Sequence, residues 1–334
     1  MAKPKHTVAS VAEMLIKDAE IAVKAGSRPK NLLDNYTQRL EGYVRPFFGK
    51  TLVTAVNHRK LKEFEAWLIE ERELAVGSVL AVMSFVSVVL KLALDEDIIS
   101  TPIRMPRLKQ KDCPRPGFTW EEYRKLLSTM KKLEKASPPI KVRAWPLTVE
   151  LRDFTTFMVN SFLRPGDAFA LRHKDGEIKK TVDGTEYLKL TSTVSKTTLG
   201  PVVTMPSAVT IYRRLKARHA ETGRSKPDDY VFLPERSGSR KFAMEIMRRQ
   251  FGLALKEAGL ETNPQGEPRT IYSLRHTAIM FRLLFGDVDL LTLARACRTS
   301  VEMIDRFYAK PLQAEMNIDR IHSMRMPSRL LAAD

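Results

Sequence analysis

Cysteine is scarce in this sequence, and it has no hydrophobic run long enough to cross a membrane. The two cysteines, Cys113 and Cys297, lie outside any Cys-x-x-Cys pair or Cys/His cluster. This excludes a disulfide framework and a zinc-finger type of site, and it favours a reducing, cytoplasmic location. One glycine and three serines interrupt the longest charge-free apolar run, 74–90, which therefore predicts a buried helix and no membrane partner. The N-terminal residues lack the apolar segment of a signal peptide.

Acidic residues are few relative to basic ones. The sequence has 39 Asp and Glu against 56 Lys and Arg, which gives a formal net charge of +17. A strongly basic protein gains affinity for nucleic acid because binding releases counterions. Solubility is the alternative reason for such a charge. The charge therefore predicts DNA or RNA as the partner, and because no RNP-type aromatic strand or KH-type loop occurs, an RNA-binding protein is the weaker alternative.

The length of 334 residues and the hydrophobic content of 43% suit two packed domains. Over residues 8–99 apolar side chains recur at helical spacing, with breaks at 26–29, 48–50 and 76–78, so we expect about four helices, of which 78–94 is the most buried. The segment 102–117 holds four prolines and five basic residues and predicts an extended connector. We therefore expect a helical domain over 1–104, a basic proline-rich linker over 105–117 and a second domain over 118–334.

The second domain mixes helices with a small β-sheet. Thr119 and Glu122 form a capping-box pattern that opens a helix, and residues 151–162 predict another helix with a short helical turn through Ala170. Alternating residues predict strands over 177–182, 187–194 and 202–205, with 196–201 as the last hairpin turn. From Arg240 onward the pattern is helical, with breaks around 263–269 and 285–287. The expected fold class is mainly α with a small β-sheet.

Five short segments resemble the motifs of the tyrosine recombinase, or phage integrase, family. They are LRPGDAFAL (163–171), SKTTLGPVV (195–203), YSLRHT (272–277), ARACRTS (294–300) and DRFYAK (305–310). The segment NYTQRLEGYVRPFFG (35–49) is similar to the start of that family's helical, SAM-like core-binding domain. The resemblance covers roughly the whole chain and implies a core-binding domain joined to an α+β catalytic domain, with too little chain ahead of them for a separate arm-binding domain.

The resemblance assigns a role in DNA cleavage to several residues. Arg164 and Arg275 correspond to the two catalytic arginines, and a guanidinium suits this task because its planar fork gives two donors to one phosphate. Lys196, in the hairpin turn, corresponds to the acid that protonates the leaving oxygen, with Lys189 as a weaker competitor. Tyr308 corresponds to the nucleophile and is expected at the end of a helix that Ser300 caps.

Asp167 fits the acidic position of the family's Arg-x-x-Asp/Glu pattern and is expected to orient an arginine. Two positions depart from the family. Tyr272 stands where histidine is usual, and Arg298-Thr299 stands where Gly-His or Gly-Trp is usual. A phenol and a threonine hydroxyl can donate to a phosphate, and Arg298 adds positive charge, but a phenol accepts protons poorly at neutral pH. His276 is interpreted as structural.

The resemblance implies a site-specific recombinase that cuts and rejoins DNA through a 3′-phosphotyrosyl intermediate, with no metal, ATP or other cofactor. Two alternatives stay open: a non-catalytic DNA-binding protein that keeps the fold, and a type IB topoisomerase-like enzyme. The resemblance also implies double-stranded DNA as the partner and self-association on it as a tetrameric synapse. The tail residues Met316, Ile318, Ile321 and Met324 would dock on a neighbouring protomer or pack on their own domain. The candidate DNA contacts in the first domain, which a solvated face would also explain, are Arg39, Arg45, Lys50, Arg59 and Lys60.

Overall fold

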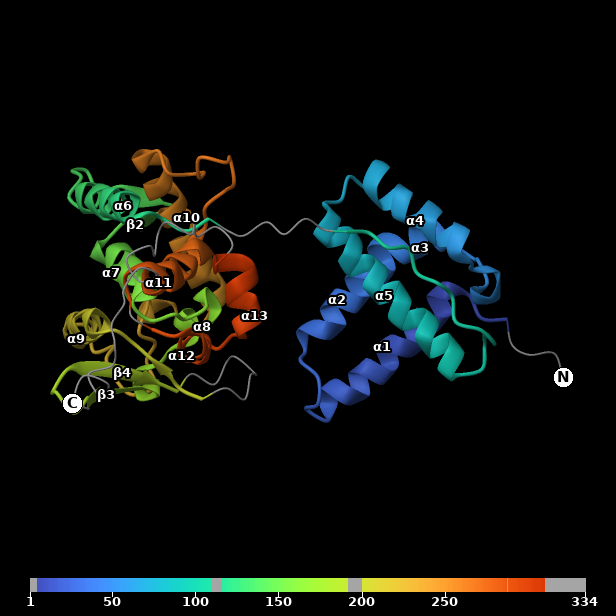
Figure 1. The fold of residues 1–334 in the computed structure, drawn as a ribbon, viewed down its shortest axis with the longest axis horizontal. Coiled ribbons are helices and arrows are strands. Elements are labelled where there is room, and N and C mark those ends of the chain that lie inside the picture. The colour runs from blue at the N-terminus through green and yellow to red at the C-terminus, as the bar shows by residue number, and fades with distance from the viewer. Residues whose placement is uncertain (1–4, 110–115, 192–199, 287, 310–334) are drawn as a thin grey trace, which may run out of the picture. The chain divides into compact units, whose positions relative to one another are not determined.

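The chain forms two compact units in a computed structural model, 1–111 and 112–334 (Figure 1). The structure describes residues 5–109, 116–191, 200–286 and 288–309. The division between the units falls within the segment 105–117. Helices dominate both units and the sheets are small, so the predicted fold class is confirmed.

Helices make up the first unit in its described part, as the apolar spacing predicts, and one isolated β-bridge pairs Thr7 with Leu52. Its α-helices are α1 (Val8–Lys24), α2 (Asn31–Arg39), α3 (Arg45–Phe48), α4 (His58–Glu70) and α5 (Val76–Asp95). A π-helical segment, Leu40–Val44, joins α2 to α3, and a 3-10 turn, Val53–Ala55, precedes α4. The side chains of Thr7 and Asn57 cap α1 and α4 by accepting hydrogen bonds from the backbone N–H of Ser10 and Lys60.

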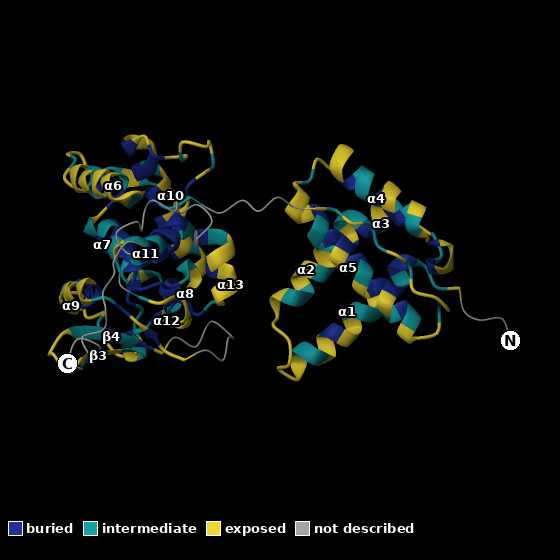
Figure 2. Cartoon of the chain, viewed as in Figure 1, coloured by how far each residue is buried: buried dark blue, intermediate teal, exposed yellow. Residues whose placement is uncertain are grey.

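Helix α5 forms the centre of this unit. By length and composition alone it could cross a membrane, but one side of it packs in the core of the unit. Figure 2 shows dark blue, buried stretches along α5. The residues that it buries are Val79, Val82, Met83, Phe85, Val86, Val89, Leu90 and Ala93. It begins at Val76, two residues before the predicted start, because the extended Ala75 already occupies the N-cap position.

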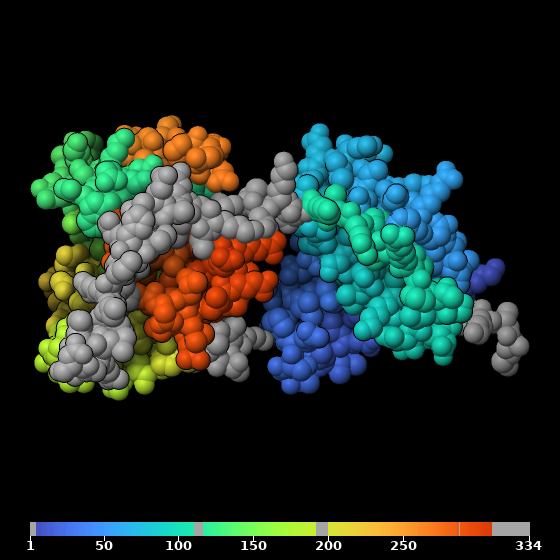
Figure 3. All heavy atoms as spheres, in the orientation of Figure 1, coloured from blue at the N-terminus to red at the C-terminus, as the bar shows by residue number. Residues whose placement is uncertain are grey.

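The end of the expected first domain and the first residues of the expected linker, 105–117, pack on the first unit. Ile103, Met105 and Leu108 are partly buried against its hydrophobic core. The carbonyl oxygen of Arg104 lies 2.8 Å from Nδ1 of His58 on α4. Figure 3 shows this segment, in blue-green, lying across the surface of the unit.

The second unit contains eight α-helices and two small antiparallel sheets within its described residues. The helices are α6 (Trp120–Leu133), α7 (Val149–Val159), α8 (Pro165–Ala170), α9 (Pro206–Ala220), α10 (Arg240–Ala258), α11 (Ile271–Phe285), α12 (Leu290–Ala296) and α13 (Val301–Ile304). One sheet pairs β1 (Lys141–Val142) with β2 (Trp145–Pro146). The other has the order β3 (Gly176–Lys180), β4 (Glu186–Leu190), β5 (Val202–Val203). In its register Ile178 faces Leu188, and Leu190 faces Val202.

Several boundaries differ from the sequence-based predictions. The capping box of Thr119 and Glu122 is present and opens α6. Helix α7 ends at Val159 instead of 162, because Phe162 has a positive φ of 55°, which a helix cannot include. The last strand stops at Val203, because Met205 already caps α9. Helix α9 and the β1–β2 pair were not predicted.

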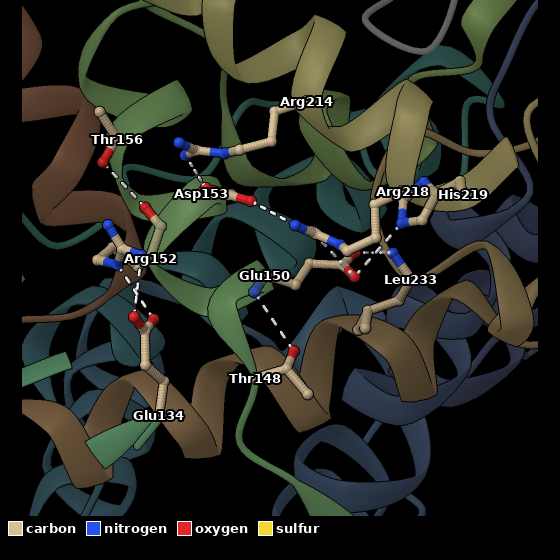
Figure 4. Close-up of polar contacts among 10 residues, drawn as sticks. All are labelled: Glu134, Thr148, Glu150, Arg152, Asp153, Thr156, Arg214, Arg218, His219 and Leu233. Atoms are coloured by element: carbon tan, nitrogen blue, oxygen red, sulfur yellow. Dashed lines mark hydrogen bonds and ion pairs between the residues drawn. The ribbon is translucent and has the colours of Figure 1, made fainter. Parts of the chain in front are cut away.

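A buried ionic cluster joins α7 to α9 (Figure 4). The carboxylate of Asp153, which is fully buried, accepts hydrogen bonds from Arg214 and from Arg218, the latter at 2.9 Å. One turn earlier, Glu150 accepts a hydrogen bond from the backbone N–H of Leu233 and lies 3.5 Å from Nε2 of His219. The cluster fixes α7, whose C-terminal end leads directly into the residues before α8.

Candidate active site

Five of the six residues predicted to be catalytic line one cavity of about 320 Å³. They come from the start of α8, from α11, from the turn after α12 and from the segment after α13, which are far apart in the sequence. The lining residues are Arg164, Tyr272, Arg275, His276, Thr299, Met303, Phe307 and Tyr308. The sixth predicted residue, Lys196, lies outside the described residues.

Arg275 is buried on α11 and is held by backbone carbonyl groups. It is 3% exposed, and its two terminal nitrogens donate to the carbonyl oxygens of Phe162 and Cys297. At Phe162, whose φ is positive, the chain turns out of the direction of α7. The carbonyl oxygen of Phe162 can therefore accept from the guanidinium of Arg275. The head group of Arg275 is therefore fixed before any ligand binds.

Arg164 precedes α8 as its N-cap residue, with extended backbone angles and with Pro165 as the first helical residue. It is half-buried, and its Nη2 donates to the carbonyl oxygen of Arg298 at 3.0 Å. Because Cys297 and Arg298 are consecutive, one turn of the chain supplies an acceptor to each of the two arginines.

Asp167 is buried in α8, one turn after Arg164. Burial raises the pKa of its carboxyl group, and the positive charges of Arg164, Arg298 and Arg275 oppose that rise. Asp167 is thus electrostatically coupled to three guanidinium groups. Such a negative charge reduces the repulsion among them, which suits the predicted orienting role.

Tyr308 lies in a π-helical turn, Asp305–Ala309, that continues α13. As expected, the side chain of Ser300 caps α13 by accepting from the N–H of Met303. Tyr308 is 8% exposed, and its burial raises the pKa of the phenol, whereas the charges of Arg275 and Arg164 lower it. Since burial is the larger effect, the phenol is neutral at physiological pH, and its use as a nucleophile requires a proton acceptor.

His276, interpreted from the sequence as structural, belongs to the cavity. Its ring stacks on the ring of Tyr308, with centroids 4.7 Å apart and an interplanar angle of 25°. The centroid of the Tyr272 ring lies 5.3 Å from that of His276. The spacing of Tyr272 and His276, four residues apart on one helix, already placed them on one face. The contact of His276 with Tyr308 depends on how the segment after α13 packs, and no local sequence pattern predicts it.

The turn at Arg298 has a backbone conformation that favours glycine. The N–H of Thr299 donates to Ala294 O and the N–H of Arg298 donates to Arg295 O, which together form a Schellman motif at the end of α12. Arg298 takes the left-handed position of this motif, with φ of 50°. Thr299, which follows it, lines the cavity, whereas Arg298 does not.

The candidate DNA contacts all lie in the first unit and differ in their partners. Arg45 forms ion pairs with Glu13 and Glu41, the latter at 2.8 Å. Glu63 pairs with both Arg59, at 3.4 Å, and Lys60, at 3.2 Å. Lys50 is exposed and Arg39 is half-buried. Arg45 is therefore less available to a phosphate than Lys50.

Within the described parts of the chain, no group of three or more His, Cys, Asp or Glu side chains could hold a metal ion. The site consists of two guanidiniums, three hydroxyl groups and an imidazole around one cavity. Such a set can bind an anion and place a phenol beside it.

Comparison with known proteins gives matches among solved structures only. No family model matches the sequence, and no curated protein matches it. A lambda integrase tetramer bound to a Holliday junction has 17% sequence identity and a TM-score of 0.64, over 91% of this chain and 79% of that chain. A lambda integrase dimer bound to a core site has 18% identity and a TM-score of 0.63, over 90% and 95%. The Tn1549 transposon integrase bound to transposon right end DNA has 14% identity and a TM-score of 0.65, over 98% and 100%. The fold is therefore that of the tyrosine recombinases, as the sequence motifs indicated.

Proposed function

We propose that the chain is a site-specific DNA recombinase that cuts and rejoins DNA through a tyrosine. The observation that carries this proposal is the convergence of Arg164, Arg275 and Tyr308 on one cavity from three separate segments. Each residue alone is compatible with an ordinary surface or core role. Together they supply what metal-free cleavage of a phosphodiester needs, namely a nucleophile and cations for the non-bridging oxygens.

In the proposed reaction the phenol oxygen of Tyr308 attacks the scissile phosphorus as its proton leaves to an acceptor. An oxygen–phosphorus bond forms to Tyr308, the bond from phosphorus to the 5′ oxygen breaks, and the 5′ oxygen takes up a proton. The products are a 3′-phosphotyrosyl link and a free 5′-hydroxyl. The 5′-hydroxyl of a partner strand reverses the step, and since the link conserves the phosphoester bond, ATP is not needed.

The residues around Tyr308 divide the remaining tasks. Arg164 and Arg275 stabilise the charge on the phosphate oxygens, and Tyr272 and Thr299 donate hydrogen bonds from their hydroxyl groups. Lys196 is the proposed acid for the 5′ oxygen. Asp167 is the proposed partner that keeps the arginines oriented.

We further propose that the two units bind duplex DNA and that several copies assemble on it. The net charge of +17 supports phosphate binding. Lambda integrase, whose fold is similar, has been solved as a tetramer bound to a Holliday junction. The corresponding proposal for this chain is a tetrameric synapse. The connector over 105–117 would let the units close around the duplex.

A suicide substrate tests the catalytic proposal. DNA from both sides of the gene is nicked near each candidate crossover, so that the cleaved fragment diffuses away and a covalent adduct accumulates. The wild-type protein should form an adduct that resists denaturation, and Tyr308→Phe should form none. Tyr230→Phe, which lies outside the cavity, is the control and should form the adduct at the wild-type rate.

Other outcomes would support the rival functions. Specific binding at these sites without an adduct would indicate a non-catalytic DNA-binding protein. An adduct together with relaxation of supercoiled DNA, in the absence of strand exchange, would indicate a type IB topoisomerase-like enzyme. Either outcome would contradict the recombinase proposal.

A further inference from the structure

Arg298 combines a left-handed backbone with a buried side chain. Its φ is 50° and the residue is 5% exposed. At the left-handed position of a Schellman motif glycine is favoured, because a Cβ is strained there. Arginine therefore destabilises this turn relative to glycine. A compensating contribution is expected from the side chain.

The guanidinium of Arg298 reaches the sheet. Its Nε donates to the carbonyl oxygen of Gly200 at 2.8 Å, and its Nη2 makes a longer contact of 3.5 Å with the carbonyl oxygen of Leu190. Leu190 is the fully buried last residue of β4, and Gly200 lies two residues before β5. One side chain thus ties the ends of two neighbouring strands to the turn after α12.

The backbone of the same turn contacts the catalytic candidates. The carbonyl oxygen of Arg298 accepts from Arg164, and that of Cys297 accepts from Arg275. Arg298 itself does not line the cavity, and its guanidinium donates to carbonyl groups of the protein. A role through other residues fits this placement, whereas direct contact with a phosphate does not.

We propose that Arg298 is a positioning residue that couples the β4–β5 edge of the sheet to Arg164 and Arg275. This inference rests on the proposed function, because it assigns to Arg298 an effect on DNA cleavage. Both the side chain and the backbone of Arg298 take part in this coupling. Its side chain fixes the distance between the sheet and the turn, and its backbone carbonyl accepts from Arg164, next to the Cys297 carbonyl that accepts from Arg275.

Arg298→Gly separates the contribution of the side chain from that of the backbone. Glycine keeps the left-handed turn without strain and removes the guanidinium. At saturating DNA we expect the adduct to form about 10- to 100-fold more slowly, because small displacements of catalytic groups have effects of this size. DNA affinity should stay at the wild-type value. Added guanidinium ion should restore part of the rate, whereas ammonium ion at equal ionic strength should not.

Two further variants distinguish a positioning effect on the adduct rate from a general loss of stability. Arg298→Lys keeps the charge but lacks the planar fork, so its rate should fall between the wild-type and glycine rates. Arg240→Lys is the matched control, since Arg240 also donates to backbone carbonyl groups, those of Phe169, Phe232 and Leu233, away from the cavity. It should leave the adduct rate unchanged.

Amide hydrogen exchange on the full-length protein without DNA gives a readout that does not depend on cleavage. In Arg298→Gly, exchange should accelerate at Leu188 and Thr204, whose hydrogen bonds join β4 to the chain after β5, and stay unchanged in α7 and α10. The inference would be overturned if Arg298→Gly formed the adduct and exchanged its amide hydrogens at the wild-type rates. It would also be overturned if exchange accelerated equally throughout the second unit. If the wild-type protein forms no adduct, the proposed function fails, and the exchange comparison still tests the tie to the sheet.

Discussion

The Nη2 atom of Arg164 donates a 3.0 Å hydrogen bond to the carbonyl oxygen of Arg298, 134 residues further along the chain. The preceding carbonyl, that of Cys297, accepts from Arg275. One left-handed turn therefore supplies a backbone acceptor to each arginine, and the carbonyl oxygen of Phe162 supplies a second one to Arg275. Carbonyl acceptors fix each guanidinium without neutralising it, and a single carboxylate, Asp167, interacts with the pair and with Arg298, so net positive charge remains available to an anion.

Arg275 and Arg164 should respond differently to replacement by lysine. Arg275→Lys leaves a buried carbonyl group unpaired and should lower the free energy of unfolding by about 1–3 kcal/mol. Arg164 is half-buried, so Arg164→Lys should cost less than about 1 kcal/mol. Both variants should slow adduct formation about 100-fold or more. Thermal unfolding and single-turnover cleavage measure the two effects, and equal destabilisation by both variants would contradict the assigned burial.

Tyr272 should influence the pH dependence of cleavage. Tyr272→Phe removes a hydroxyl that is proposed to donate to the phosphate, so the rate should fall about tenfold. Tyr272→His introduces a group with a reference pKa of about 6.5, so the rate should rise and gain a titration in that region. A pH–rate profile of the three proteins tests this. Identical profiles for tyrosine and histidine would show that position 272 takes no part in proton transfer.

The buried phenol of Tyr308 should reduce stability at alkaline pH. Burial raises its pKa, against the opposing charges of Arg275 and Arg164, while the unfolded phenol titrates near pH 10. Above about pH 10 the unfolded state has lost the proton that the folded state retains, so the free energy of unfolding falls as pH rises. Tyr308→Phe should therefore lose less stability than the wild type between about pH 9 and pH 11. Urea unfolding across this range measures the difference, with Tyr36→Phe in the first unit as the control.

The ion pairs of the first unit predict that Lys50 and Arg45 contribute unequally to DNA binding. Lys50 is exposed, so Lys50→Ala should weaken binding and reduce the slope of log affinity against log salt by about 1. Arg45 is held by Glu13 and Glu41, so Arg45→Ala should change the slope less. Fluorescence anisotropy titrations at several salt concentrations measure both slopes. A larger change for Arg45→Ala would contradict the assignment.

Much of the helical architecture could be predicted from local patterns. The apolar spacing of the first unit, the capping box at Thr119 and Glu122 and the cap at Ser300 are all present in the structure. The predicted helix ends were wrong where the chain turns, as at Phe162. A positive φ at a non-glycine residue has no sequence signature. Helix α9 was missed, and part of what fixes it is its ionic contact with α7, made by residues about 60 positions apart.

The arrangement inside the site was less predictable than its composition. The motifs contain every residue of the cavity except Met303, but they did not reveal the stack of His276 on Tyr308 or the contacts of Arg298 with Gly200 and Leu190. These contacts depend on how α12 and α13 pack against α11 and the sheet. Local sequence patterns carry information about helices and turns, and packing between segments distant in the chain lies beyond them.

The position of the covalent link tests the central claim most directly. The adduct from a suicide substrate is digested with protease and nuclease, and the peptide that carries nucleotide is sequenced by mass spectrometry. The account predicts a single modified residue, Tyr308, joined to a 3′ phosphate, with a free 5′-hydroxyl on the released strand. A link to any other residue, or to a 5′ phosphate, would contradict it.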